Sequence, residues 1–375
     1  MNKPTVQDIF QCFYPAYLEK YSPSPEQAKV ARNIMNCKTG AYGTNISVCE
    51  DCGAVQIHYN SCRNRCCPMC QAVPKEMWMD ARREDVLDAP YFHLVFTVPD
   101  ILNPVIYSNQ RLLYDALYHA ASSTISELTA DPKHLGAKVG YICILHTWGS
   151  EMNFHPHIHT ILLGGGLASN NQWKDNGENF FLPIRVISKM FRGKYLEELK
   201  RLWEEDKLVF HGTAEKFRNH YTFKELLDSC YGMDWIPHCK KTFNGAQTVI
   251  KYLGKYTHRI AVSNHRIVRM DDDTVTFLVK DYRNEGQWKE LTISGVEFVR
   301  RFLMHVPPRR FVRIRHYGLL CSRTKSQKLT LCRNLLGCKK YLSKLRDMEM
   351  PEILEHLYGI KVCVCKACGG HLGKP

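Results

Sequence analysis

The sequence predicts an α+β fold with a central antiparallel sheet, preceded by a zinc-binding unit and followed by a basic C-terminal region. Three observations lead to this prediction. Short apolar runs of strand character are interspersed with helical patterns in the middle of the chain, two CxxC pairs fall within the first 70 residues, and a long segment near the end lacks acidic residues. We expect the corresponding domains at residues 1–89, 90–265 and 266–375.

Length and composition describe a folded protein rather than a disordered one. The chain has 375 residues, of which 45% are hydrophobic and 11% aromatic, enough for a sizeable core and two or three domains. The first residues show no signal-peptide pattern, and nowhere do 18 apolar residues follow one another. We therefore expect no membrane partner, a cytoplasmic location, and metal binding rather than disulfides for the 17 cysteines.

The first unit begins with two helices and contains most of the clustered cysteines. We expect helices over 6–21 and 25–35, separated by the turn sequence SPSP, and a polar helix over 74–87. Two CxxC knuckles 14 residues apart predict one closed tetrahedral zinc site, made by Cys49, Cys52, Cys67 and Cys70. The alternative is a set of buried free cysteines.

Other residues near these knuckles are also able to bind metal. A second ion is possible, with ligands drawn from Cys37, His58, Cys62 and Cys66. Arg63 and Arg65 lie beside the cysteines and suit contacts with phosphates. Near the C-terminus a weaker metal prediction concerns Cys363, Cys365, Cys368 and His371, with Cys332 or Cys338 as further candidates and free thiols as the alternative.

The second unit has the alternation of strands and helices expected for an α+β domain. We expect a strand over 91–98, a helix over 109–128, and an antiparallel pair of strands over 139–148 and 155–163. Three glycines, 164–166, are expected to end the last strand. Helices over 186–205 and 246–256 complete the unit.

Three histidines share one face of a predicted strand. Residues two apart on a strand point the same way, so His155, His157 and His159 are expected to converge. A single histidine in this position is ordinarily a core residue, whereas three together favour a divalent metal with open coordination positions. His146, on the preceding strand, is placed to reach the same ion.

A pair of tyrosines follows in a basic helical segment. Tyr252 and Tyr256 are four residues apart, and Lys255 and Arg259 lie among them. Two such tyrosines are most often packing residues. The surrounding positive charge makes them candidate nucleophiles toward a phosphate, which a phenol attacks only with metal or cationic assistance.

The last unit indicates a nucleic-acid partner. The formal net charge is +14, and residues 298–346 contain 14 lysines and arginines without one acidic residue, after a predicted hairpin over 274–279 and 288–293. A solvated basic surface is the alternative. The alternation of apolar residues with Arg309, Arg310, Arg313 and Arg315 suits single-strand binding with base stacking, but equally an amphipathic element packed inward.

Several long motifs resemble one family of enzymes. PHIH together with YLGKYTHR resembles the HUH endonucleases, and more closely the two-tyrosine rolling-circle transposases of the insertion sequence 91 family. SCRNRCCPMC, HTWGSEMNFHPHIHTILLGGG, YLGKYTHRIAVSNHRI and FVRRFLMHVPPRRFVRIRHYGLL occur in the family's order and cover most of the chain. Cys66 departs from the pattern, since the family more often has histidine before the CP knuckle.

The resemblance implies an HUH-type nuclease domain and a mechanism. His157 and His159 match the HUH pair, His146 is our choice of third ligand over His155, and the ion is Mg²⁺ or Mn²⁺. Tyr252 and Tyr256 match the catalytic tyrosines, which form a 5′-phosphotyrosine link with single-stranded DNA at element ends or targets. Lys255 and Arg259 are candidates for stabilising charge on the phosphate. No nucleotide cofactor is expected, because the reaction conserves bond energy and no GxxxxGK[ST] loop is present.

The family resemblance also implies a bacterial protein associated with the nucleoid. Three other functions remain open from the residues. A replication initiator or relaxase would use the same chemistry, a zinc-containing nucleic-acid-binding protein would bind without cutting, and a histidine–metal hydrolase would cut without covalent attachment.

Overall fold

The computed structural model describes residues 3–176, 182–235, 238–243, 248–249, 254, 260–281 and 284–373. Within this part of the chain the principal sheet has six strands in the order β11-β4-β5-β3-β7, with β6 paired to β5. All its pairings are antiparallel. The predicted α+β class with a central antiparallel sheet is confirmed. The strands of this sheet are β3 (Tyr91–Thr97), β4 (Lys138–Trp148), β5 (Phe154–Leu167), β6 (Trp173–Asp175), β7 (His238–Phe243) and β11 (Ile314–Gly318).

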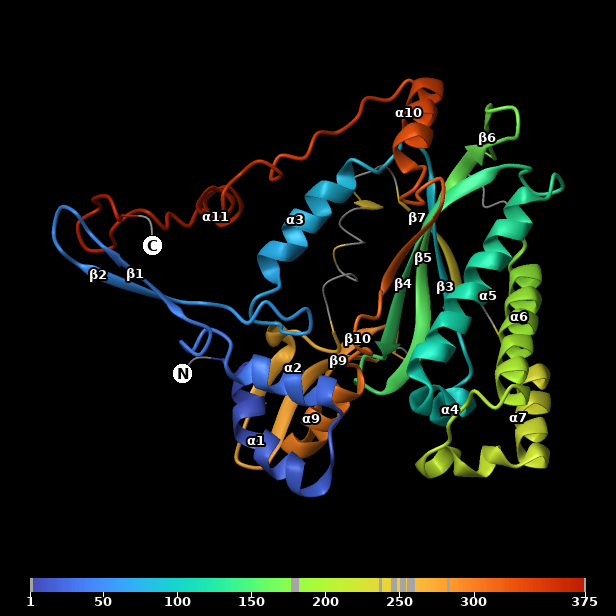
Figure 1. Cartoon of the computed structure of the whole chain (residues 1–375), viewed down its shortest axis with the longest axis horizontal. Coiled ribbons are helices and arrows are strands. Elements are labelled where there is room, and N and C mark those ends of the chain that lie inside the picture. The colour runs from blue at the N-terminus through green and yellow to red at the C-terminus, as the bar shows by residue number, and fades with distance from the viewer. Residues whose placement is uncertain are drawn as a thin grey trace.

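A layer of helices covers one face of the sheet (Figure 1). Because side chains alternate along a strand, Phe92, Leu94 and Phe96 of β3 enter the same core as the apolar residues of these helices. The residues between them face the other way. The layer contains α4 (Asn103–Ser108), α5 (Gln110–Ala130), α6 (Ile184–Glu204) and α7 (His220–Gly232), with 3₁₀ turns η1 (Asp100–Leu102) and η2 (Gly212–Arg218).

The opposite face of the sheet has a second, smaller core. Ile144 of β4 and Ile161 of β5 pack there with Met79 of α3 (Ala72–Arg83) and Leu329 of α10 (Lys325–Leu336). Val249, a described residue within the helix predicted over 246–256, is 1% exposed and belongs to this same cluster. This face therefore receives elements from the beginning, the middle and the end of the chain.

The N-terminal helices pack against residues far away in the sequence. Helix α1 (Val6–Lys20) begins at a capping box formed by Thr5 and Asp8, and α2 (Pro25–Met35) begins after Ser24. Their buried faces share one core with a small sheet and its helix. These partners are β8 (Ile267–Met270), β9 (Thr274–Asp281), β10 (Gln287–Ser294) and α9 (Gly295–Met304), with the 3₁₀ turn η3 (Asn264–Arg266) before them.

An arm extends away from the sheet, as Figure 1 shows at the left. It contains the hairpin of β1 (Thr44–Val48) and β2 (Val55–Tyr59), and beside it α11 (Met350–Tyr358) and the end of the chain. None of the described helices is long and apolar enough to cross a membrane.

Two details differ from the expectations. The three glycines 164–166 lie inside β5 and do not end it. Glycine is required there because a Cβ would meet neighbouring atoms; at Gly166 it would lie 2.4 Å from the carbonyl oxygen of Lys138. In addition, contacts cross the expected domain boundaries. Strand β11, from the basic C-terminal region, forms an edge of the central sheet, and α9 packs on α1. The domain bounds at 89 and 265 stay a prediction.

Candidate functional site

Three histidines meet at one end of the two longest strands. His146 of β4 pairs directly with His157 of β5, and His159 follows two residues later on the same face. One ring nitrogen of each histidine lies within 4.8 Å of those of the other two, and all three side chains are buried. The structure thus brings together His146, His157 and His159. The ring of His155 lies 5.2 Å from that of His157, but His155 is not part of this group, and its Nδ1 is 3.1 Å from Oδ1 of Asp100.

Hydrogen bonds orient two of the three rings. His157 Nδ1 lies 2.6 Å from the backbone oxygen of His155, so this nitrogen donates and Nε2 carries the lone pair. His159 Nε2 is 3.1 Å from His157 Nε2. Burial, followed by the nearby charge of His155, lowers the pKa of His157 to about 4. Burial, with the surrounding histidines, also lowers the pKa of His159 well below its usual range. Both rings are therefore neutral at pH 7.

His93 is a fourth histidine of this site that the sequence reasoning missed. It lies on β3, and its Nε2 is 2.8 Å from Nδ1 of His159. When His159 donates from Nδ1 to His93, its Nε2 presents a lone pair toward His157, as a metal ligand requires. The available signal was a polar residue inside the apolar run YFHLVF. A single buried histidine in a strand does not by itself indicate a metal site.

This donor set fits a divalent cation. Three imidazoles converge on one point, and the Nε2 atoms of His157 and His159 are only 3.1 Å apart. Two facing lone pairs repel unless a proton or a cation lies between them. Three protein ligands also leave coordination positions open for substrate oxygens.

Trp148 connects the histidines to the basic region and the cysteines. Its ring stacks on His146 with centroids 4.5 Å apart and an interplanar angle of 19°. The guanidinium of Arg313 lies 5.6 Å from the centroid of Trp148, and Arg313 is also close enough to Cys66 to influence the pKa of that thiol. A set of ring contacts therefore runs from Arg313 through Trp148 to His146.

The predicted nucleophiles lie outside the described residues. This applies to Tyr252 and Tyr256, and equally to Lys255 and Arg259. Gly254, however, is described, and a Cβ at this position would lie 1.8 Å from Sδ of Met79. Any larger residue at this position would therefore require the side chain of Met79 on α3 to move. Gly254 and Val249 thus both contact the core on the histidine-bearing face of the sheet.

The cysteines form two groups of four, which differ from the predicted grouping. Cys67 and Cys70 lie with Cys37 and Cys62 at the base of the β1–β2 hairpin, with all Sγ atoms within 4.8 Å. We call this group the base cluster. The neighbouring thiols of Cys62 and Cys70, followed by burial, raise the pKa of Cys67 well above its usual range. Four such thiols ionise together only around a cation, which fits zinc.

The other CxxC pair belongs to a second group. Cys49 and Cys52 lie with Cys365 and Cys368, again with all Sγ atoms within 4.8 Å, and we call this group the tip cluster. The single site of Cys49, Cys52, Cys67 and Cys70 is therefore wrong as a grouping, because the hairpin strands separate the two knuckles. Cys37 and Cys62 were predicted for a second ion and lie in the base cluster, whereas His58 and Cys66 belong to neither group.

The expected DNA-binding arginines divide into exposed and internal ones. Arg63, Arg65, Arg309 and Arg310 are exposed, although Arg65 also donates to the carbonyl oxygen of Phe311 at 2.7 Å. Arg313 is only 9% exposed. Arg315 pairs with Asp115, and its guanidinium lies 4.0 Å from the centroid of Tyr118.

Of the two interpretations of this run, base stacking and inward packing, Phe311 follows the second. Phe311 is 2% exposed and belongs to the helix-side core. Several basic residues of the acid-free segment also pair with acids from elsewhere in the sequence. Besides Arg315, these are Arg300 and Arg301 with Glu297, Lys325 with Asp85, and Lys340 and Arg346 with Glu84.

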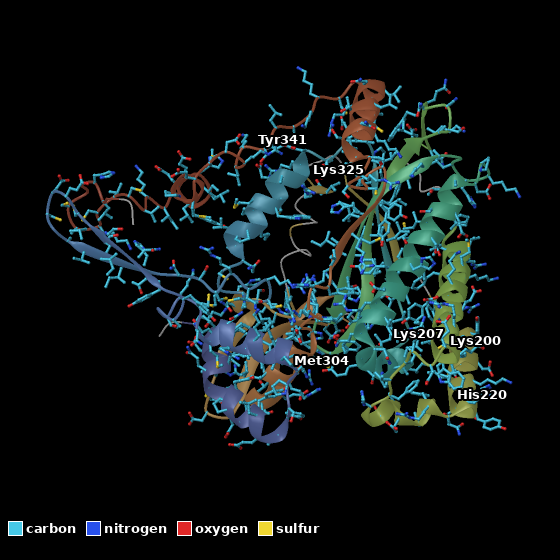
Figure 2. All side chains as sticks on the ribbon, viewed as in Figure 1. Lys200, Lys207, His220, Met304, Lys325 and Tyr341 are labelled. Atoms are coloured by element: carbon cyan, nitrogen blue, oxygen red, sulfur yellow. The ribbon has the colours of Figure 1, made fainter. Side chains whose placement is uncertain are left out.

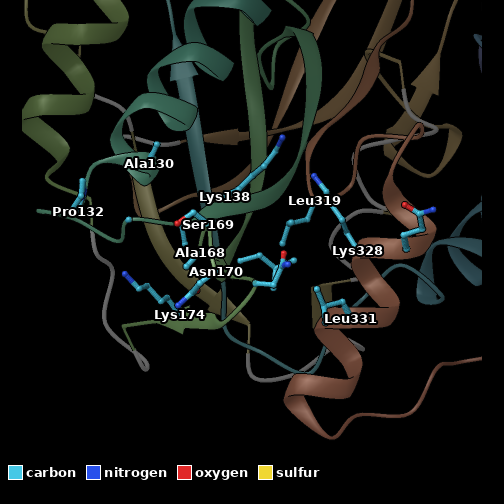
Figure 3. A pocket seen from close by; sticks show the side chains of 15 residues that line it. Ala130, Pro132, Lys138, Ala168, Ser169, Asn170, Lys174, Leu319, Lys328 and Leu331 are labelled. Atoms are coloured by element: carbon cyan, nitrogen blue, oxygen red, sulfur yellow. The ribbon is translucent and has the colours of Figure 1, made fainter.

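A lysine-lined cavity of about 770 Å³ lies at the opposite end of β4 and β5 from the histidines (Figure 3). Lys138, Lys174 and Lys328 line it, and no acidic residue is among its described lining residues. Burial, followed by the charge of Lys138, lowers the pKa of Lys328. An anion in this cavity would relieve the repulsion between the ammonium groups.

Comparisons with known proteins show which family the chain resembles. The family model described as "Transposase zinc-binding domain" matches residues 9–98, and the one described as "Putative transposase" matches residues 140–328. A Sinorhizobium fredii protein named "Putative transposase y4qJ" is 39% identical over 369 residues, which cover 97% of this chain and 93% of the relative. The transposase for insertion sequence element IS801 of Pseudomonas savastanoi pv. phaseolicola is 30% identical over 308 residues, which cover 81% and 72% of the two chains.

Among solved structures, a metal-free conjugative relaxase TrwC in complex with OriT DNA is similar at 14% identity, over 46% of this chain and 68% of that one. The TM-score of 0.24 is too low for any conclusion about this chain.

Proposed function

The chain belongs to the insertion sequence 91 family of transposases, and we propose that it nicks and rejoins single-stranded DNA by attack of a tyrosine on a scissile phosphate. The observation that carries this proposal is the convergence of the buried side chains of His146, His157 and His159 on one face of the sheet. It suits a divalent ion next to a phosphodiester.

The histidines would hold the ion, and the other residues of the site would keep them in place. His157 is oriented by the backbone oxygen of His155, and His159 by His93. Trp148 stacks on His146 and restricts its ring. A bound Mg²⁺ or Mn²⁺ would supply Lewis-acid polarisation of the scissile phosphate.

Tyr252 or Tyr256 would provide the attacking oxygen. In this reaction the tyrosine oxygen bonds to phosphorus, the bond from phosphorus to the 3′-oxygen breaks, and that oxygen takes up a proton. One phosphoester replaces another, so ATP is not required. Contacts of Val249 and Gly254, which lie on either side of Tyr252 in the sequence, support a nucleophile on the histidine-bearing face. Lys255 and Arg259 would stabilise negative charge on the phosphate.

DNA contacts outside the site would involve the phosphate backbone. Arg63 and Arg65 flank the base cluster, and Arg309 and Arg310 follow α9; all four are exposed. Their charge would neutralise phosphates without reading the sequence. We also propose that the protein works at the nucleoid.

Replacing Lys138 and Lys328 by glutamine should weaken binding of single-stranded DNA and reduce its dependence on salt. Each lost phosphate contact lowers the slope of log affinity against log salt by about 0.7. Fluorescence anisotropy between low and high salt measures this slope. Lys200 and Lys207 are exposed and lie at the end of the helical layer away from α10 (Figure 2). Their replacement by glutamine provides a matched double variant that should keep the slope of the unmodified protein. Equal slopes in both double variants would show that the lysine-lined cavity does not contact the DNA.

The proposed function is tested with a single-stranded oligonucleotide from the end of the element. In the presence of Mg²⁺ or Mn²⁺ we expect cleavage at one position, a 3′-end that a polymerase extends, and a 5′-end resistant to labelling by kinase. A second strand that supplies a free 3′-hydroxyl should be joined to the cleaved one. Tight binding of a correct end without cleavage in either metal would instead favour a DNA-binding protein without this activity.

A further inference from the structure

The tip cluster joins two segments that are more than 300 residues apart in the sequence. The Sγ atoms of Cys49 and Cys368 lie 3.5 Å apart, and those of Cys52 and Cys365 lie 3.7 Å apart. Cys49 and Cys52 come from the turn between β1 and β2. Cys365 and Cys368 lie near the C-terminus, outside the matched residues 9–98 and 140–328.

Both pairs are built as the same turn. The N–H of Gly53 donates to the carbonyl of Cys49 at 3.0 Å, and the N–H of Gly369 donates to the carbonyl of Cys365 at 2.9 Å. These glycines have φ of 71° and 77°, which a residue with a Cβ rarely adopts. Backbone N–H groups of Ala367 and Gly370 point at the sulfurs of Cys365 and Cys368, each at 3.4 Å. Such turns orient two sulfurs toward one ion and stabilise their negative charge.

Backbone pairing unites the two turns into one small unit. Cys49 forms a β-bridge with Leu372, and the N–H of Glu50 donates to the carbonyl of His371 at 3.3 Å. Leu372 is fully buried in a cluster with Cys49 and Cys365. The two knuckles thus face each other as in a zinc ribbon, although one half comes from each end of the chain.

We propose that Cys49, Cys52, Cys365 and Cys368 bind one structural Zn²⁺ and so fasten the C-terminal segment to the tip of the hairpin. Four thiolates in a closed group are the preferred ligands of zinc. Sulfur separations of 3.5 and 3.7 Å are far longer than the roughly 2.05 Å of a disulfide. The predicted weak C-terminal knuckle therefore has its missing partners on the hairpin, whereas His371 and Cys363 are outside the group.

The zinc site that joins the C-terminal segment to the hairpin, which we call the clasp, would close a ring of the chain that includes α3. On its way to the arm, the C-terminal segment docks on Asp80, which accepts hydrogen bonds from the Tyr341 and Ser343 hydroxyls, both at 2.6 Å, and from the backbone N–H of Leu345. Figure 2 shows Tyr341 beside this helix. Beyond that anchor, α11 buries only Ile353 among its residues. The C-terminal segment is therefore anchored to α3 just before residue 347 and to the hairpin at the tip cluster.

The same ring would help to fix the position of α3. This helix contacts Gly254 through Met79 on one side and the C-terminal segment through Asp80 on the other. Metal at the tip cluster would thus keep the hairpin, α3 and the C-terminal segment in one arrangement. The inference concerns the architecture of the chain and does not depend on the proposed cleavage reaction.

Cobalt substitution of the full-length protein tests the clasp. Thiolate-to-cobalt charge transfer reports only cysteine sites, so the histidine cluster does not contribute. We expect the Cys365→Ser/Cys368→Ser variant to lose about half of this absorption and one zinc per chain relative to the unmodified protein. Cys363→Ser, in the same segment but outside the cluster, should keep both values. Unchanged absorption and zinc content in the double variant would overturn the proposal.

Limited proteolysis provides a second readout that does not rely on metal content. Loss of the clasp should make cleavage within residues 347–373 roughly tenfold faster or more, while the central sheet stays protected. A Cys368→His variant that retains Cys365 should keep the zinc and the protection that the double serine variant loses, because imidazole can replace thiolate as a zinc ligand. Equal protection of this segment in the unmodified protein and the double variant would show that zinc does not hold it.

Discussion

Replacing His157 and His159 together by alanine is expected to abolish metal-dependent cleavage of single-stranded DNA. The double variant loses two of the three imidazoles that converge within 4.8 Å, and the single remaining ligand, His146, cannot hold an ion alone. Loss of one positioned electrostatic stabiliser typically costs about 10²–10³-fold in rate, so the loss of the whole site should reduce cleavage to background. A labelled oligonucleotide on a denaturing gel measures the rate over a series of Mn²⁺ concentrations.

Two variants serve as controls for this experiment. His155→Ala should retain cleavage, because His155 pairs with Asp100 and lies outside the cluster. His93→Ala should weaken metal binding by about 10–100-fold through the loss of its hydrogen bond to His159, and added Mn²⁺ should compensate. Cleavage by a folded His157→Ala/His159→Ala protein at the unmodified rate would exclude the histidine cluster from the reaction.

Replacing both Tyr252 and Tyr256 by phenylalanine is expected to eliminate covalent attachment of DNA while leaving its binding intact. Phenylalanine keeps the ring and removes only the oxygen that would bond to phosphorus. Each single variant should retain partial activity, and the variant whose first cleavage is slower identifies the tyrosine that attacks first. Cleavage rate and binding affinity, measured on the same oligonucleotide, separate the nucleophile from the binding surface.

Tyr221→Phe is a suitable control for the tyrosine variants. Tyr221 is 75% exposed on α7, in the layer on the other face of the sheet, and we expect no change in attachment when its hydroxyl is removed. Attachment that survives in the Tyr252→Phe/Tyr256→Phe protein would assign the nucleophile to another residue.

The central sheet and its histidines could be predicted because both depend on local periodicity. Alternation along the strand indicated that His157 and His159 share a face, and His146 could be placed across from them on the preceding strand. The same alternation also predicted that His155 joins them, and the structure leaves His155 outside the group. His93 could not be predicted, because its role depends on the neighbouring strand order, which places β3 next to β5. The catalytic role of the tyrosines stays a prediction from the sequence.

Partners in the cysteine clusters could not be predicted from spacing alone. A CxxC pair indicates that two sulfurs share an ion but does not say which other pair completes the site. Cys49 and Cys52 have their partners more than 300 residues away, whereas the nearer knuckle of Cys67 and Cys70 is completed by single cysteines. Only the three-dimensional path of the hairpin and the C-terminal segment decides between these combinations.

The basic segment shows why charge counting overestimates an open DNA surface. The run of residues without acids suggested unpaired positive charge, yet several of its cations pair with acids that precede it in the sequence, such as Glu84 and Asp85. Phe311 belongs to the core, so the alternation of arginines with apolar residues partly records packing. Arg309 and Arg310 remain exposed and available for phosphates.

The most direct measurement follows a label placed on the 3′ side of the scissile bond. After incubation with Mg²⁺ or Mn²⁺ and denaturation, we expect the label to migrate with the protein, and digestion to yield a nucleotide-bearing peptide that contains Tyr252 or Tyr256. The label should not remain when the metal is chelated. Cleaved DNA with a free 5′-phosphate and unlabelled protein would contradict the account, because water would then be the nucleophile.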